Sequence, residues 1–305
     1  MQFVSTRGGP EVGLETAIMA GTAPDGGLYV PVQLPEIHAS ECPVDAPLSD
    51  VAKFVLRPFF AGSSIADQFD EICESAFNFS APVRMIENES HALAVLELFH
   101  GPTAAFKDFG ARFLAATMAR IVAQQKPQAE PATVVVATSG DTGGAVAAAF
   151  HQQPGMRVVV LFPEGRVSAR QQHQLTCWGD NVIALAVRGE FDDCQRVAKA
   201  LFADEVNSAR HNLCSANSIN VGRLLPQSVY YAKTSTDAQA ARAELSRFIV
   251  PTGNLGNAFA CAWARSFGFP ISDLVLATNA NQTIPDYLLD GDWQPRSSVA
   301  TLASA

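Results

Sequence analysis

The chain has few charged residues and lacks the sequence patterns of secreted and membrane-spanning proteins. Lys, Arg, Asp and Glu make up 17% of its 305 residues and 48% are hydrophobic, which is the composition of a folded protein rather than a disordered one. No apolar run approaches the ~20 residues that span a bilayer. The N-terminus has no basic start followed by an apolar stretch, so we do not expect a secretory signal.

Basic residues are outnumbered, and the cysteines form no recognisable pattern. The 21 Lys and Arg against 30 Asp and Glu give a formal charge of -9, which argues against nucleic acid or an anionic membrane as the main partner. An anionic substrate therefore needs a local positive site. The six cysteines include no C-x-x-C pair, so we expect neither a disulfide framework nor a metal site, but reduced thiols in a cytoplasmic protein.

What the sequence does contain is a repeated strand, turn and helix pattern in its second half. Short β-branched runs lead into glycine-bearing turns and then into alanine-rich stretches, which predicts an α/β fold with parallel strands. The runs are continuous rather than alternating, which predicts strands buried on both faces. The first ~90 residues lack this pattern and favour a separate, partly helical region. The segments concerned are residues 133–150, 157–163, 181–202, 247–267 and 273–279.

Two of the strand-to-helix turns, SGDTGG at 139–144 and PTGNLGN at 251–257, are predicted to wall one cleft, because ligands bind beyond the carboxyl ends of parallel strands. The backbone N–H groups of PTGNLGN are suited to a phosphate, although a tight turn needs glycine in any case. In SGDTGG the hydroxyls of Ser139 and Thr142 are suited to a carboxylate. Alternatively, Ser139 and Asp141 cap the following helix. Neither turn matches a standard nucleotide fingerprint, which disfavours a nucleotide-binding protein.

Lys107 lies in the segment ELFHGPTAAFKDFGARFLA, at the start of a helix that we expect to begin after Pro102. A lysine is most often exposed on a helix surface, and that interpretation stays open from the residues alone. Burial among apolar neighbours and the positive helix end would instead lower the pKa of Lys107 from its ordinary ~10.4 and leave an amine able to form a Schiff base. The neighbours concerned are Ala105, Phe106, Phe109 and Phe113.

HGPTAAFKDFG, TSGDTGGA and PTGNLGN together resemble the motifs of threonine synthases, and they occur in that family's order. The resemblance extends to DGGLYVP, LCSANSINVGRLLPQ and ATNANQTIPDYLLDGDW, so it covers essentially the whole chain. It implies the tryptophan-synthase-like fold (fold type II), with parallel sheets covered by helices and an N-terminal region. It further implies an N-terminal region over residues 1–90, a smaller α/β domain over 91–225, and the start of a larger α/β domain over 226–305.

The resemblance also assigns site residues. Lys107 would hold pyridoxal 5'-phosphate as an aldimine and shuttle protons, and Asp141 would lie near the ring hydroxyl of the cofactor. Ser139 and Thr142 would bind the substrate carboxylate. The cofactor phosphate would be held by Gly253, Asn254, Leu255, Gly256 and Asn257. The phosphate of the substrate would be held by Asn217, Ser218, Asn220 and Arg223, although an ordinary surface arginine is an equally good explanation of Arg223 from the sequence alone.

The activity implied is that of a lyase that converts O-phosphohomoserine and water to L-threonine and phosphate in amino-acid biosynthesis, as a monomer or homodimer. A phospholyase acting on another phosphorylated amine and a non-catalytic protein that keeps the fold are the alternatives. Family members continue beyond the position of Ala305. We therefore expect the larger domain to be truncated in this chain, without the hydroxyl that faces the pyridine nitrogen of the cofactor.

Overall fold

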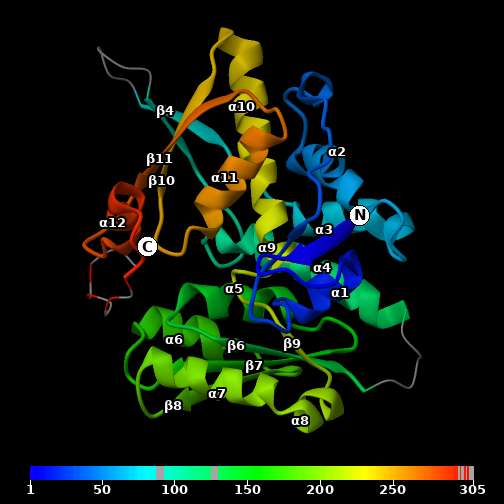
Figure 1. Cartoon of the computed structure of the whole chain (residues 1–305), viewed down its shortest axis with the longest axis vertical. Coiled ribbons are helices and arrows are strands. Elements are labelled where there is room, and N and C mark those ends of the chain that lie inside the picture. The colour runs from blue at the N-terminus through cyan, green and yellow to red at the C-terminus, as the bar shows by residue number, and fades with distance from the viewer. Residues whose placement is uncertain (87–92, 125–129, 295, 297–298, 300, 302–305) are drawn as a thin grey trace.

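The chain begins with a small antiparallel sheet and one helix, which lies between the second and third strands of the sheet in the sequence (Figure 1). The computed structural model describes residues 1–86, 93–124, 130–294, 296, 299 and 301. The sheet has the order β2-β1-β3, and Phe3 on its central strand is fully buried. The elements are β1 (Gln2–Ser5), β2 (Val12–Gly13), α1 (Leu14–Ala20) and β3 (Tyr29–Pro31).

Three helices form an aromatic core in the middle of the molecule. The ring of Phe60 lies 4.6 Å from that of Phe69 and 5.7 Å from that of Phe113, which joins all three helices. The last of the three, α4, is buried along most of its length, so it acts as the central helix on which the rest of the fold packs. The elements are η1 (Ala39–Glu41), α2 (Leu48–Phe60), η2 (Ala66–Gln68), α3 (Phe69–Ala76) and α4 (Lys107–Gln124).

A four-stranded parallel sheet of order β8-β7-β6-β9 forms the part of the molecule at the bottom of Figure 1. Successive side chains of β6 point to opposite faces: Val134 and Val136 join the main core, whereas Val135 packs with Cys194 of α7. The strands are β6 (Ala132–Ala137), β7 (Met156–Pro163), β8 (Val182–Val187) and β9 (Leu213–Ser215). The helices are α5 (Asp141–Phe150), α6 (Ala169–Thr176), α7 (Phe191–Ala203), α8 (Glu205–Arg210) and α9 (Val221–Leu224).

The remaining elements contain two separate two-stranded sheets. β10 and β11 pair in parallel, and β4 and β5 pair antiparallel. Strands β4, β5 and β10 line one groove of about 1020 Å³, together with α10. The strands are β4 (Val83–Ile86), β5 (Leu93–Leu96), β10 (Ser246–Pro251) and β11 (Ile271–Ala277). The other elements are η3 (Leu225–Gln227), α10 (Ser228–Arg242), α11 (Gly256–Ser266) and α12 (Thr283–Asp290).

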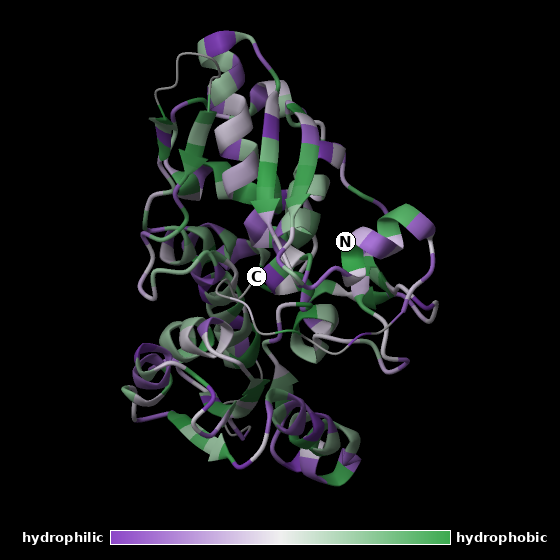
Figure 2. Cartoon of the chain, turned by 90° about the vertical axis from the view of Figure 1, so that its left-hand side faces the viewer, coloured by the Kyte–Doolittle hydropathy of each residue, from purple (hydrophilic) through white to green (hydrophobic). Residues whose placement is uncertain are grey.

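The predicted fold class, an α/β fold with parallel strands covered by helices and an N-terminal region, is confirmed. The prediction that the strands are buried on both faces is correct for β6 but wrong for β8, β10 and β11. Ile249 of β10 is 59% exposed and Ile183 of β8 is 57% exposed. Figure 2 shows β10 and β11 as hydrophobic along much of their length. An apolar run therefore produces burial on both faces only where another element covers each face.

Three expectations, about membrane-spanning helices, cysteines and metal sites, can be compared with the structure. Within the described ranges, no helix is both long enough and apolar enough to cross a bilayer. The six cysteines are all unpaired, and five are buried whereas Cys177 is exposed. The described residues also contain no group of three or more His, Cys, Asp or Glu suited to a metal ion.

Candidate active site

A capped turn presents Lys107 as the first residue of α4. Both the backbone N–H and the hydroxyl of Thr103 donate to the carboxylate of Asp108, over 2.8 and 2.6 Å. Ala104 adopts a left-handed conformation with φ of 55°. The helix thus starts at Lys107 and not directly after Pro102, because Asp108 ties residues 103–106 into a turn. This turn fixes where the Lys107 side chain leaves the backbone.

The Lys107 side chain is 22% exposed and lies between an aromatic ring and a carboxylate. Its Nζ is 4.7 Å from the ring centre of Phe106 and 3.8 Å from Oδ2 of Asp141. Phe109 and Phe113 face the aromatic core instead, so they do not surround the amine. Burial lowers the pKa of Lys107, Asp141 opposes that shift, and the positive charge of Arg223 adds to it. The amine is therefore easier to deprotonate than that of an ordinary surface lysine.

The SGDTGG turn is held by a threonine that precedes it. The hydroxyl of Thr138 accepts hydrogen bonds from the N–H groups of Gly140 and Gly143, each at 2.9 Å. The alternative that Ser139 and Asp141 cap α5 is wrong, because Gly140 is the N-cap residue and no side chain caps there. Gly140 has φ of 150°, which moves the helix start away from Ser139. As a result the Ser139 hydroxyl is exposed and free to bind a ligand.

Gln171 of α6, which the sequence analysis missed, holds Asp141 from the other side. Its Nε2 donates to Oδ1 of Asp141 over 2.9 Å, while its Oε1 accepts from the N–H of Ser168 over 3.1 Å. A Cβ on Gly140 would lie 2.6 Å from the Cδ of Gln171, so this glycine is required by the close approach of α6. The only signal in the sequence was the Ser-x-x-Gln spacing of a capping box at residues 168–171.

The PTGNLGN turn leaves its backbone donors free. Leu255, the residue before α11, has a left-handed φ of 59°, which is rare for a residue with a branched side chain. Within the part of the chain that the structure describes, the N–H groups of Gly253, Asn254 and Leu255 have no backbone partner. Successive free N–H groups at a helix N-terminus form an anion-binding concavity. The local geometry thus supports the predicted phosphate site.

Two tyrosines of α10 fix the far end of this turn. The hydroxyls of Tyr230 and Tyr231 both donate to Oδ1 of Asn257. Burial raises the pKa of both tyrosines, so they remain neutral donors. Oδ1 of Asn257 is therefore engaged on the protein side, which leaves the Nδ2 and the backbone N–H of Asn257 as its donors toward the predicted phosphate. Sequence reasoning did not find the tyrosines, because nothing local connects α10 with residue 257.

The Asn220 side chain is occupied by hydrogen bonds within the protein. It donates to the carbonyls of Ile18 and Ser215 and accepts from the N–H of Gly222, all within 2.9 Å. It is fully buried. This geometry disfavours the predicted contact of Asn220 with substrate, because its amide caps α9 and ties that helix to α1.

Arg223 differs from Asn220, because it is buried and its hydrogen-bond donors are not all taken up within the protein. It is 1% exposed, its Nη1 donates to the carbonyl of Ala216 over 2.9 Å, and its Nε has no partner. Burial lowers the pKa of Arg223 to about 10, and its main charged neighbour is Asp108. The alternative of a surface arginine is wrong. The side chains of Asn217 and Ser218, six and five residues before it, are half-buried.

Two close backbone contacts bring these segments together. A Cβ on Gly110 of α4 would lie 2.8 Å from the carbonyl oxygen of Arg223, so glycine lets the two helices touch. A Cβ on Gly256 would lie 3.7 Å from the carbonyl oxygen of Ser218. The segment 217–223 thus contacts both the helix of Lys107 and the PTGNLGN turn. That SGDTGG and PTGNLGN wall one cleft stays a prediction.

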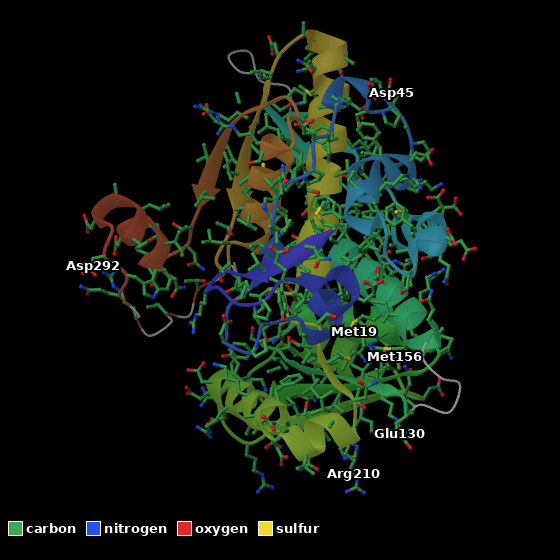
Figure 3. All side chains as sticks on the ribbon, turned by 45° about the vertical axis from the view of Figure 1, so that its right-hand side comes forward. Met19, Asp45, Glu130, Met156, Arg210 and Asp292 are labelled. Atoms are coloured by element: carbon green, nitrogen blue, oxygen red, sulfur yellow. The ribbon has the colours of Figure 1, made fainter. Side chains whose placement is uncertain are left out.

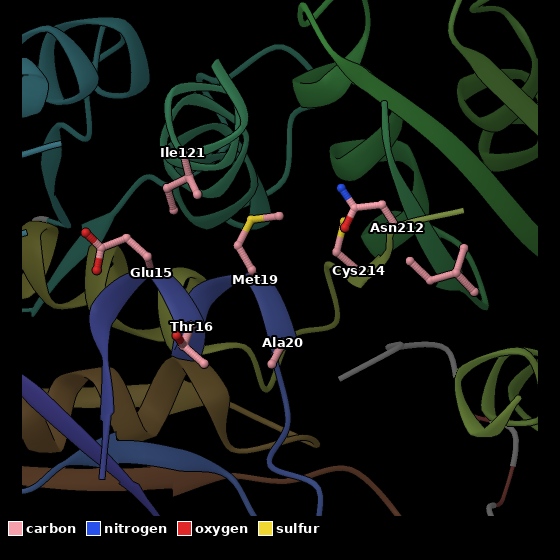
Figure 4. A pocket seen from close by; sticks show the side chains of 8 residues that line it. Glu15, Thr16, Met19, Ala20, Ile121, Asn212 and Cys214 are labelled. Atoms are coloured by element: carbon pink, nitrogen blue, oxygen red, sulfur yellow. The ribbon is translucent and has the colours of Figure 1, made fainter. Parts of the chain in front are cut away.

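Pockets in the structure lie beside this constellation rather than on Lys107. The large groove lined by β4, β5, β10 and α10 reaches Asn257 and so borders the PTGNLGN turn. A smaller pocket of about 390 Å³ lies between α1, α4 and β9, and it is lined by Glu15, Met19 and Cys214 among others (Figures 3 and 4). Glu15 already accepts from the N–H of Ser64, and none of the predicted site residues lines this smaller pocket.

The residues present fit pyridoxal 5'-phosphate. The cofactor needs an amine that deprotonates readily, an anion site for its phosphate, and polar groups near its ring. Lys107, the free N–H groups before α11 and the carboxylate of Asp141 have these properties. The guanidinium of Arg223, whose Nε has no partner among the described residues, is a second cationic group near Lys107. The free N–H groups and this guanidinium are what a phosphorylated cofactor and a phosphorylated substrate would each require.

Comparison with known proteins identifies the family. The family described as "Threonine synthase N terminus" matches residues 2–77, and "Pyridoxal-phosphate dependent enzyme" matches residues 81–305. A threonine synthase from Serratia marcescens is 41% identical over 303 residues, covering 97% of this chain and 67% of the relative. The PLP-bound threonine synthase from Brucella melitensis superposes with a TM-score of 0.88 at 39% identity, over 99% of this chain and 65% of that one.

A second solved relative agrees with the first. The threonine synthase from Escherichia coli superposes with a TM-score of 0.87 at 36% identity, covering 99% of this chain and 70% of that one. This chain therefore spans about two thirds of the length of its relatives. Both family matches, the relatives and the solved structures agree: the chain belongs to the threonine synthase family of pyridoxal-phosphate-dependent enzymes.

Proposed function

We propose that this chain acts as a threonine synthase, converting O-phosphohomoserine and water to L-threonine and inorganic phosphate with pyridoxal 5'-phosphate held by Lys107. The observation that carries the proposal is the pairing of a half-buried amine with a carboxylate 3.8 Å away and a buried arginine beside it. Membership of the family supports the same assignment. When bound, the cofactor supplies an electron sink that stabilises negative charge on carbons next to the amino group of the substrate.

The two phosphate groups are assigned to two different sites. The N–H groups of Gly253, Asn254 and Leu255, with that of Asn257, would hold the phosphate of the cofactor, because a helix N-terminus with free donors favours an anion. The N–H of Gly256 instead donates to the carbonyl of Asn254 over 2.8 Å, so of the predicted phosphate ligands it is the one whose donor is already used. The guanidinium of Arg223, with Asn217 and Ser218, would hold the phosphate of the substrate. A fully buried guanidinium with an unpartnered Nε is costly unless an anion completes its hydrogen bonds.

The remaining residues orient the substrate and move protons. Ser139 and Thr142 would bind its carboxylate, since both hydroxyls lack hydrogen-bond partners within the described ranges and lie in the turn next to Lys107. One proton leaves the α carbon of the substrate and another leaves the β carbon, and phosphate leaves the γ carbon. A proton is then delivered to the γ carbon, water adds at the β carbon, and a proton returns to the α carbon. The Nζ atom of Lys107 is the group suited to carry these protons, because burial favours its neutral form.

Product analysis tests the proposal. Purified chain given pyridoxal 5'-phosphate and O-phosphohomoserine should release threonine and phosphate in equal amounts. Lys107→Ala should abolish both products and the visible absorbance of the covalently held cofactor, whereas Lys199→Ala, at an exposed position on α7, should change neither. Release of phosphate with 2-oxobutyrate in place of threonine would reject the proposed activity.

A further inference from the structure

The helix α6 contacts both segments that surround Lys107. Gln171 donates to Asp141 in the SGDTGG turn, and Nε2 of Gln174 donates to the carbonyl of Thr103 over 3.3 Å in the turn before α4. These two turns are far apart in the sequence. α6 is thus the element that joins them from the outside.

The SGDTGG turn lies close to this helix at its glycines, and Gly143 is approached by Thr138 as well. A Cβ on Gly143 would lie 2.8 Å from Cδ2 of Leu175, and a Cβ on Gly144 would lie 3.5 Å from the Cβ of Gln174. Gly140 is approached by Gln171 in the same way. The backbone of the turn therefore packs directly against α6, which leaves little freedom in the position of Gln171.

The side-chain amide of Gln171 is fixed at both ends. The N–H of Ser168 donates to Oε1 of Gln171, so the side-chain amide cannot rotate freely. The backbone N–H of Gln171 in turn donates to Oγ of Ser168 over 3.2 Å. Nε2 of Gln171 donates to Oδ1 of Asp141. The other oxygen, Oδ2, is the one that lies 3.8 Å from Nζ of Lys107.

We infer that Gln171 is a positioning residue, which holds the Asp141 carboxylate toward the Lys107 amine and thereby sets how readily that amine loses its proton. The inference deepens the proposed function, on which its catalytic meaning rests. The charged groups that face Lys107 are Asp141 from α5 and Arg223 from α9, and Asp108 follows it on its own helix. Asp141 is the only one of the three that Gln171 contacts.

Two substitutions at position 171 should change the neutral fraction of the Lys107 amine in opposite directions. In Gln171→Met the carboxylate of Asp141, which is 36% exposed, turns toward water and supports the ammonium form less. In Gln171→Glu a second negative charge next to Asp141 supports the ammonium form more. Only the neutral amine reacts with an acylating reagent, so the rate at fixed pH reports the change.

The test measures acylation of Lys107 by peptide mass spectrometry, across pH, in the full chain freed of cofactor. At fixed pH below the midpoint, Gln171→Met should react about threefold faster and Gln171→Glu about threefold slower, the size expected of a half-exposed ion pair. Gln172→Met and Gln172→Glu, at the exposed neighbouring position, serve as matched controls and should react like the unchanged chain. Circular dichroism confirms that each variant is folded.

The outcomes separate this inference from the proposed function. If both Gln171 variants react at the wild-type rate, or if both shift in the same direction, Gln171 does not position Asp141 and the inference is overturned. The measurement needs neither cofactor nor substrate, so it stands even if the chain makes no threonine. If threonine is made and the rates do not move, the function survives and the positioning role fails.

Discussion

The two turns at the candidate site begin alike and are organised in different ways. Each starts with a buried threonine directly after a strand, Thr138 after β6 and Thr252 after β10, and each threonine N–H donates to the neighbouring strand. The Thr138 hydroxyl then accepts two backbone N–H groups of its turn. The Thr252 hydroxyl makes no hydrogen bond within the described ranges, and the N–H groups after it stay free.

This difference separates a turn organised by side chains from one organised by its backbone. In the first, the Thr138 hydroxyl takes two of the backbone donors, so a ligand meets the exposed Ser139, the half-buried Thr142 and the remaining N–H groups beside them. In the second, the free N–H groups are what a ligand meets, and Leu255 accepts a strained conformation there. The same strand, turn and helix pattern thus provides a site for specific polar contacts and a site for a phosphate.

Removing the hydroxyl of each threonine should give the largest difference in stability between the two turns. Thr138→Val leaves the buried N–H groups of Gly140 and Gly143 without a partner, which should lower the free energy of unfolding by about 2–3 kcal/mol. Thr252→Val removes no hydrogen bond of its turn and should cost less than about 1 kcal/mol. Urea unfolding of the two variants measures the difference. Equal losses would mean that the turns are not organised differently.

Adding a methyl group to one glycine of each turn sharpens the same comparison. Gly143→Ala places a Cβ 2.8 Å from Leu175 and closer still to Thr138, so overpacking should cost about 1–2 kcal/mol. Gly256→Ala meets the tip of Leu224 at 3.3 Å and the carbonyl oxygen of Ser218 at an ordinary 3.7 Å, and the change should stay within about 0.5 kcal/mol. Thermal or urea unfolding of both variants provides the values. A larger loss in Gly256→Ala would contradict the idea that the second turn is open.

The strand, turn and helix units were predictable because they depend on local pattern. Continuous β-branched runs, glycine turns and alanine-rich stretches place the starts of β6, β7, β10 and β11 within two residues of their observed starts. Lys107 and the two glycine turns were found in the same way. These features need no knowledge of what lies across the fold.

The features that were missed depend on contacts between distant segments. Gln171 reaches a turn thirty residues earlier, and Tyr230 reaches Asn257 from another helix. Thr138, rather than Ser139, organises the first turn because Gly140 adopts a φ of 150° that the sequence alone permits but does not require. Asn220 was assigned to substrate although its amide caps α9, since a cap and a ligand contact need the same residue type.

The smallest expected effect is the pH dependence of the free energy of unfolding that arises from Lys107, the amine beside the first turn. Burial lowers the pKa of Lys107 in the folded chain relative to its ordinary ~10.4. Below the folded pKa the amine is charged in both states, and folding carries the full cost of burying that charge. Between the two pKa values only the unfolded chain holds the proton, so the free energy of unfolding rises with pH. Above the ordinary value both states are neutral and the cost is gone.

Lys107→Met should therefore be more stable than the unchanged chain at pH 7 without cofactor, and the gap should close as the pH approaches 10.5. Urea unfolding at several pH values measures this gap. Lys199→Met, at an exposed position on α7, should show no such closing. A gap that stays constant across the pH range would mean that Asp141 fully compensates the Lys107 ammonium, so that the folded chain favours neither form of the amine.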